Sequence, residues 1–290
     1  RWPPSVRPRR PVPPSSRRAE RAMCGIAGFV APPGERADRD LLERMVVTLR
    51  HRGPDALGYF VDGRVGLGVA RLRVIDLPTG DQPIPNEDGS VRVALNGEIY
   101  NYRTLRSDLA GRGHQFATRS DTEVIVHAWE EYGEHCPDHF NGMFALALWD
   151  GRREQLFLAR DRMGEKPLYY AHADGWLVFG SELRAVLAHP ATRRELDLRS
   201  VSRYLAYDFV PDPHSMVRDV RKLPPAHTLT ASDGKVSVQS YWEIPFKPDS
   251  APDEAPCEPR ELGIERAEGV RLEETDERAR PLSRAPVDEV

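Results

Sequence analysis

Hydrophobic and polar positions follow two different periods along this chain, and each period predicts its own kind of element. In residues 38–53 apolar side chains recur with the spacing of one helix face, directly after Asp38, a candidate N-cap. A second helical pattern covers 120–133, where Ser120 and Glu123 have the spacing of a capping box. We therefore expect two amphipathic helices, each with one face against a sheet.

Short apolar segments typical of strands lie between and after these helices. In residues 64–77 and 91–100, apolar residues either alternate with polar ones or follow one another without a break. Residues 142–183 have the pattern of three or four strands joined by Asp-Gly turns. The run from Met143 to Trp149 is apolar at every position, as expected for a strand covered on both faces. Short connections between strands favour antiparallel pairing. The pattern predicts an α+β protein with layered antiparallel sheets and helices on their outer faces.

Both ends of the 290-residue chain differ from the middle. Residues 1–22 hold seven arginines and six prolines, and residues 245–290 are rich in proline and charge with little periodicity. Such segments bury too little apolar surface to offset the entropy of ordering, so we expect both to be disordered. For 1–22 we favour an upstream or cloning remnant over a functional leader. Residues 23–244 are expected to form the folded domain.

Composition restricts the partners. The formal net charge is −4, so nothing in the overall balance favours nucleic acid, and no apolar run is long enough to span a membrane. Cys24, Cys136 and Cys257 are few, odd in number and far apart, which argues against a disulfide framework. We expect a cytoplasmic protein whose partner is a small molecule.

Cys24 is the first candidate for chemistry. It follows Met23, and removal of that methionine would make it a chain terminus with both a thiol and a free α-amine. A thiol with a pKa of about 8.5 needs a base, and an α-amine with a pKa of about 7.7–8.0 is close to the ideal one at neutral pH. The alternative is a structural cysteine at the start of a strand.

Two other polar groups allow competing interpretations. Asn96 and Gly97 could donate hydrogen bonds from a side-chain amide and a backbone N–H to an oxyanion, but Asn-Gly is also the strongest short signal for a hairpin turn. A histidine-rich group suggests zinc, yet its spacing fits no standard motif, so we favour exposed or helix-end histidines and predict no metal site. That group is His127, His135, Cys136 and His139.

A series of motifs in fixed order then points to a family. They are MCGIAGFV, LRHRGPD, VARLRVIDL, GDQPI, LNGEIYN, SDTEVIVHAW, GMFALALWD, ARDRMGEKPLYY and FGSELRAVL. Together they resemble the amino-terminal glutaminase half of glutamine-hydrolysing asparagine synthetases, which are class II glutamine amidotransferases with the N-terminal-nucleophile hydrolase fold. The resemblance implies a four-layer αββα sandwich and a type 2 amidotransferase domain over residues 23–244.

The resemblance also implies catalytic roles. Cys24 resembles the nucleophile that attacks the side-chain amide of glutamine, giving a glutamyl thioester and ammonia while its own α-amine moves the protons. Asn96 and the Gly97 N–H resemble the oxyanion hole. No cofactor is implied for this half-reaction.

For substrate binding the resemblance implies four residues. Arg71 corresponds to the group that binds the α-carboxylate of glutamine, and Asp121 to the one that pairs with its α-ammonium, with Glu98 assisting. Arg52 is expected beside the site. Without the resemblance, Arg71 would be read as a surface strand residue and Asp121 as a first-turn helix carboxylate.

The sequence departs from the family pattern after about Trp242. The pyrophosphate-loop signature of the synthetase domain, which would use ATP and Mg²⁺ to activate aspartate, is missing from the printed sequence. Asparagine synthesis is therefore an expectation for a full-length parent, whose synthetase domain would accept the ammonia. Two alternatives stay open: a catalytically idle pseudo-glutaminase or interaction module, and the amidotransferase half of a synthetase with another acceptor. A homodimer is also left open.

Overall fold

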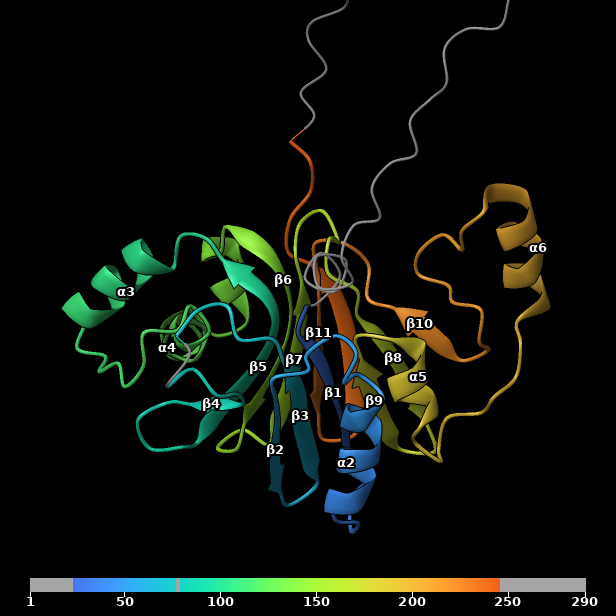
Figure 1. The fold of residues 1–290 in the computed structure, drawn as a ribbon, viewed down its shortest axis with the longest axis horizontal. Coiled ribbons are helices and arrows are strands. Elements are labelled where there is room, and N and C mark those ends of the chain that lie inside the picture. The colour runs from blue at the N-terminus through green and yellow to red at the C-terminus, as the bar shows by residue number, and fades with distance from the viewer. Residues whose placement is uncertain (1–22, 77–78, 246–290) are drawn as a thin grey trace, which may run out of the picture. The chain divides into compact units, whose positions relative to one another are not determined.

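Two six-stranded antiparallel sheets form the centre of the fold in the computed structural model, which describes residues 23–76 and 79–245 (Figure 1). The first sheet has the strand order β10-β8-β9-β1-β3-β2, and the second has β12-β11-β7-β6-β5-β4. The strands are β1 Gly25–Val30, β2 Ala56–Asp62, β3 Val65–Arg71, β4 Ile84–Pro85, β5 Val91–Ile99, β6 Gly142–Asp150, β7 Gln155–Arg160, β8 Tyr169–Ala173, β9 Trp176–Gly180, β10 Val220–Lys222, β11 His227–Ser232 and β12 Lys235–Ser240.

Helices cover the outer face of each sheet, and the apolar side chains lie in three layers between these elements. Helices α2 and α5 pack on the first sheet, the inner faces of the two sheets pack on each other, and α3 and α4 pack on the second sheet. The helices are α2 Arg39–Val47, α3 Tyr102–Gly111, α4 Glu123–Tyr132, the 3₁₀ helix η1 Gly133–His139, α5 Leu183–Leu187 and α6 Leu198–Tyr207. The expected four-layer αββα sandwich of antiparallel sheets is confirmed.

Strand β6 shows why the apolar run of the sequence belongs at the centre. Its residues from Phe144 to Asp150 are all buried. Alternate side chains point to opposite faces of a strand, so Ala145 faces the other sheet while Phe144 and Leu146 face α4. A strand with helices on one side and a sheet on the other therefore has no exposed face.

The two helix starts follow different rules. As predicted, Asp38 caps α2 by accepting the N–H of Asp40 at 2.9 Å. The capping box predicted for α4 is wrong, because the carboxylate of Glu123 instead accepts the N–H of Ala117 at 2.6 Å. Glu123 is buried, so its charge is satisfied by the preceding loop rather than by Ser120.

The predicted disordered ends fall mostly outside the described residues: all of 1–22, and the tail from 246 to 290. Within residues 23–76 and 79–245, none of the helices combines the length and the apolar content that crossing a membrane requires.

Candidate active site

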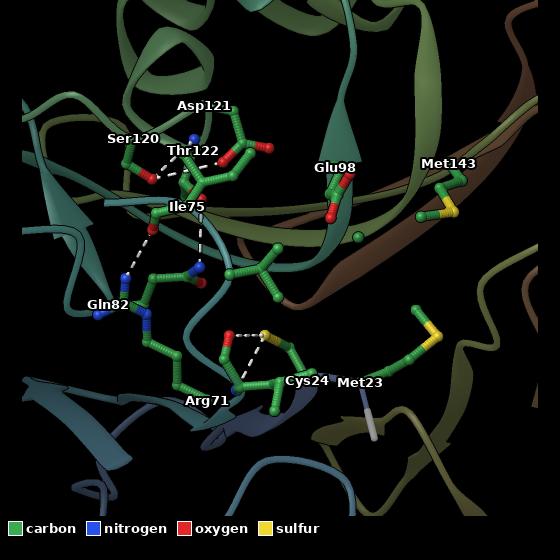
Figure 2. Close-up of a pocket in the computed structure, with 13 residues that line it drawn as sticks. Met23, Cys24, Arg71, Ile75, Gln82, Glu98, Ser120, Asp121, Thr122 and Met143 are labelled. Atoms are coloured by element: carbon green, nitrogen blue, oxygen red, sulfur yellow. Dashed lines mark hydrogen bonds between the residues drawn. The ribbon is translucent and has the colours of Figure 1, made fainter. Parts of the chain in front are cut away.

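A pocket of about 210 Å³ lies where the ends of β1 and β3 in one sheet approach β5 and β6 in the other. Figure 2 shows Cys24 and Arg71 entering from one side of it, and Glu98 and Asp121 from the other. Its lining residues are Met23, Cys24, Arg71, Leu72, Val74, Ile75, Gln82, Gly97, Glu98, Ser120, Asp121, Thr122 and Met143. Five of the seven residues expected at the site line this one pocket; Arg52 and Asn96 do not.

Cys24 stands directly before β1 and is half-buried. Its Sγ lies 3.4 Å from the N of Leu72 and 3.6 Å from the O of the same residue, so the thiol is held by backbone across the sheet edge. Burial raises the pKa of the Cys24 thiol, although the Leu72 N–H, Arg71 and Arg52 act against the rise. At neutral pH the group is therefore a thiol that needs a base to become a nucleophile.

Arg52 holds the main chain around Cys24. Its Nε donates to the carbonyl oxygen of Cys24 at 3.0 Å, and its Nη1 donates to Glu182 at 3.1 Å. The backbone N of Met23 in turn donates to the carbonyl oxygen of Arg52 at 2.9 Å. The side chain expected beside glutamine thus contacts the backbone of Cys24.

Arg71 ends β3 with a buried guanidinium, which overturns the surface interpretation. Its Nη2 donates to the carbonyl oxygens of Ile75 at 3.1 Å and Asp76 at 2.8 Å, and its Nη1 pairs with Asp81. Gly80 packs on this group so closely that a Cβ there would lie 2.7 Å from Nη2 of Arg71. The loop after β3 therefore fixes the orientation of the guanidinium.

Asp121 is buried on the opposite side of the pocket, beside Glu98. Its Oδ2 accepts the backbone N–H of Ile99 at 2.9 Å. Burial and the nearby Glu98 raise the pKa of Asp121 against the effect of that bond. Because α4 begins at Glu123 with Thr122 as its N-cap, Asp121 precedes the helix, and the first-turn interpretation is wrong.

Asn96 and Gly97 lie inside β5, opposite Ala145 and Phe144 of β6, so the hairpin alternative is wrong. Gly97 has a φ of 144°, and a Cβ there would lie only 2.0 Å from the carbonyl oxygen of Met143. Only glycine fits this position. An Asn-Gly pair that resembles a turn signal instead marks a place where two strands approach closely.

The side chain of Asn96 is buried just behind the pocket lining. Its Nδ2 lies 3.5 Å from Oγ of Ser181, which also accepts the N–H of Ile26 at 3.0 Å. The Oδ1 of Asn96 has no hydrogen-bond partner among the described residues. Ser181 therefore connects the amide to β1, two residues beyond Cys24.

Sequence reasoning missed the role of Gln82, although its motif GDQPI was noticed. Its Oε1 accepts the N–H of Leu95 at 2.6 Å, and its Nε2 donates to Thr122 at 3.1 Å. One side chain thus ties β5 to the segment that carries Asp121. The only signal was a glutamine in a predicted loop, which gives no hint of a long-range partner.

The suspected group of histidines and cysteine does not form one site. His135 and His139 are exposed, and Cys136 is buried. The expectation of exposed or helix-end histidines is wrong for His127, which lies buried within α4. Its Nδ1 faces the carboxylate of Glu87, from outside its own element, which a sequence pattern does not reveal.

Comparison with known proteins agrees with this fold. The family model of the glutamine amidotransferase domain matches residues 23–242. The chain is 38% identical over 226 residues to glutamine-hydrolyzing asparagine synthetase 3 of Bacillus subtilis, covering 77% of this chain and 37% of that protein. It is 34% identical over 245 residues to the amidase chry2 of Gibberella zeae, covering 80% of this chain and 36% of that protein. The chain thus spans less than half the length of these relatives.

A solved structure shares the fold. Glutamine phosphoribosylpyrophosphate amidotransferase from Bacillus subtilis, complexed with ADP and GMP, has a TM-score of 0.55 and 18% identity, covering 76% of this chain and 50% of that chain. At that identity the structural similarity supports the fold alone, and it agrees with the expected N-terminal-nucleophile hydrolase architecture. With the sequence match running from Met23 through almost the whole folded region, this chain belongs to the glutamine amidotransferase domain family.

Proposed function

We propose that this chain hydrolyses the side-chain amide of glutamine, with Cys24 as nucleophile once it is the first residue. The observation that carries the proposal is that one pocket of about 210 Å³ is lined by the thiol, by a buried arginine and by two carboxylates. An amino-acid substrate brings a carboxylate and an ammonium at one end and an amide at the other. The pocket offers a partner for each.

Charge complementarity sets the direction of binding. Arg71 is the cation for the α-carboxylate, and its present partner Asp81 is 58% exposed in its side chain, so a substrate carboxylate can take that place on the guanidinium. Asp121 and Glu98 are the anions for the α-ammonium. This leaves the amide end of glutamine directed toward Cys24.

The proposed bond formation and proton transfers use two groups of the terminal residue, the thiol and the α-amine of Cys24. The α-amine of Cys24 takes the thiol proton, Sγ forms a bond to the amide carbon, and the carbonyl oxygen becomes an oxyanion. Collapse of that intermediate breaks the C–N bond of the glutamine amide. The proton held by the α-ammonium of Cys24 passes to the departing nitrogen, which leaves as ammonia. Water, deprotonated by the α-amine of Cys24, then attacks the thioester carbon. The C–S bond breaks, glutamate is released, and the thiolate of Cys24 takes the proton back from the α-ammonium.

The oxyanion is assigned to Gly97 N–H and to the amide of Asn96. Among the described residues, Oδ1 of Asn96 has no hydrogen-bond partner, and Nδ2 makes only a long 3.5 Å contact to Oγ of Ser181. Turning the amide by half a turn pairs Oδ1 with the hydroxyl of Ser181, which still accepts the N–H of Ile26. Nδ2 is then free to donate to the oxyanion, and Ser181 becomes a positioning residue.

The test of this function is the release of glutamate and ammonia from glutamine. A chain whose first residue is Cys24 is expected to form the two products in equal amounts, and to act far more slowly on asparagine, whose shorter side chain does not bring the amide to the thiol. Absence of turnover by that chain would contradict the proposal and favour the idle pseudo-glutaminase.

Replacing Asp121 with asparagine is expected to raise KM for glutamine by about tenfold or more, with a smaller change in kcat, because a charge-assisted hydrogen bond to the α-ammonium is lost. Asparagine keeps an oxygen that can accept the Ile99 N–H. The matched control is Asp174→Asn, in the exposed turn between β8 and β9, which should leave KM unchanged. An unchanged KM in Asp121→Asn would remove Asp121 from the binding site.

The fate of the ammonia is proposed from the relatives. The bacterial relative is named a glutamine-hydrolyzing asparagine synthetase, and the fungal one an amidase. We assign the ammonia to an ATP- and Mg²⁺-dependent synthetase domain of a longer parent in the cytoplasm, with aspartate as first candidate acceptor. Another acceptor would leave the glutaminase pocket unchanged, because the acceptor does not bind there.

A further inference from the structure

Four side chains from three separate segments meet on the outer side of the second sheet. Glu87 lies between β4 and β5, His114 follows α3, and His127 and Glu130 lie one turn apart on α4. One ligand atom from each lies within 4.8 Å of the other three. None of these residues lines the pocket of Cys24, so the cluster has no part in the proposed hydrolysis.

The spacing of the cluster suits a tetrahedral ion. His127 Nδ1 lies 3.3 Å from Oε2 of Glu130 and 3.5 Å from Oε2 of Glu87, and His114 Nδ1 lies 3.5 Å from Oε2 of Glu130. His114 Nδ1 also lies 3.9 Å from the carboxylate of Glu87, through Oε1, and the four ligand atoms all lie within 4.8 Å of one another. Bonds of about 2.0–2.2 Å to a tetrahedral ion place neighbouring ligand atoms roughly 3.3–3.6 Å apart.

The chain holds both carboxylates in place. Oε1 of Glu87 accepts the N–H of Gln115 at 2.9 Å, and Oε1 of Glu130 accepts from Asn86 Nδ2 at 2.7 Å. In each case the second oxygen, Oε2, is the one that faces His127. One oxygen of each carboxylate is therefore used for positioning and the other is directed to the centre.

Both imidazoles are oriented in the same way. Each presents Nδ1 to the centre; Nε2 of His114 lies at hydrogen-bond distance from Glu131, 3.0 Å, whereas Nε2 of His127 lies 3.9 Å from Glu123 and has no hydrogen-bond partner among the described residues. Metal-binding histidines commonly have a carboxylate behind the nitrogen that does not bind the metal, because it fixes the tautomer and strengthens the ligand. A simple ion pair needs only one nitrogen and one carboxylate.

The balance of charge also favours a cation. His127 is buried, with Phe116 packed on its ring at 4.4 Å. Three carboxylates, those of Glu87, Glu123 and Glu130, lie within 3.9 Å of the two ring nitrogens of His127. Glu87 and Glu130 reach the surface, which gives an ion a route to the buried nitrogen.

We propose that Glu87, His114, His127 and Glu130 form a binding site for a divalent transition-metal ion, with Zn²⁺ as the ion that two imidazoles and two carboxylates in tetrahedral spacing suit best. The ion would join the β4–β5 connection, the end of α3 and the middle of α4. Because α4 begins two residues after Asp121, the same ion would stabilise the segment that carries one wall of the pocket.

The test is calorimetric titration of Zn²⁺ into the full chain carrying Cys24→Ser, which removes the competing thiol of the pocket. We expect saturable binding of one ion per chain and a melting temperature that rises with Zn²⁺. His114→Gln and Glu87→Gln, both at less buried ligands, should each weaken binding at least tenfold. Glu131→Gln, which removes the carboxylate behind His114, should weaken it by about tenfold.

The matched control is His135→Gln. His135 also faces a carboxylate three residues away, Asp138 at 3.3 Å, but it is 85% exposed in its side chain and belongs to no such cluster. The His135→Gln variant should bind Zn²⁺ with the same affinity as the parent. Absence of saturable binding in the parent, or binding that is equally tight in His114→Gln and Glu87→Gln, overturns the site and leaves a histidine–carboxylate ion-pair network.

Discussion

Replacing Cys24 with alanine is expected to lower the rate of glutamate release from glutamine by about 10⁴-fold or more, because the change removes the sulfur atom that is proposed to form the thioester. The Sγ atom is held between the backbone N and O of Leu72 at the pocket edge, and alanine keeps the backbone of this position while removing only that atom. Glutamine binding should survive, since Arg71 and Asp121 are untouched. Rates of glutamate formation and glutamine affinity are measured on the same preparation.

The control for this change is Cys136→Ala. Cys136 is a free thiol like Cys24, but it is buried in η1 against the helical side of the second sheet. Burial raises the pKa of Cys136 well above its ordinary value, so it is inert as a nucleophile. Cys136→Ala should keep its activity if it stays folded by thermal melting. Turnover by Cys24→Ala at the parent rate would show that the nucleophile lies elsewhere.

Replacing Asn96 with alanine is expected to reduce kcat by about 10²–10³-fold while KM for glutamine changes little, because the lost donor acts only on the oxyanion. Ser181→Ala should reduce kcat less, since it removes the group that orients the amide rather than the amide itself. Both variants are compared by steady-state kinetics after their folding has been verified, because Asn96 is buried.

Asn101→Ala is the matched control for Asn96. It belongs to the same motif, but its side chain bonds the backbone of His139 and Asn141 rather than approaching the pocket. It should retain kcat. A higher KM for glutamine with an unchanged kcat in Asn96→Ala would mean that Asn96 binds the substrate and does not stabilise the oxyanion.

The fold was predictable because the pattern of apolar residues along the chain reflects which faces of each helix and strand are buried. The run from Met143 to Trp149 could be apolar throughout only in a strand covered on both faces, and β6 has a sheet on one side and helices on the other. The start of α4 was mispredicted because Ser120 and Glu123 have the right spacing for a capping box, while burial of Glu123 favours bonds to the preceding loop. Local spacing does not reveal such tertiary competition.

The candidate site was predictable in its residue types but not in its connections. The resemblance, supported by charge logic, paired the α-carboxylate of glutamine with Arg71 and its α-ammonium with Asp121, yet the burial of these two side chains depends on the loop after β3 and on Ile99. The cluster around His127 was not predicted, because the sequence grouped His127 with His135, Cys136 and His139 instead. Its four members span 87 to 130 with no recognisable spacing, and only the packing of α4 brings them together.

The central claim, that a terminal Cys24 hydrolyses glutamine with its own amine as base, is tested most directly by comparing two chains of verified intact mass. One begins at Cys24, and the other keeps Met23, whose backbone N donates to Arg52 and whose side chain lines the pocket. Glutamate release should be at least about 10²-fold faster for the chain that begins at Cys24, since an amide cannot replace the α-amine as base. Equal rates from both chains would contradict this mechanism.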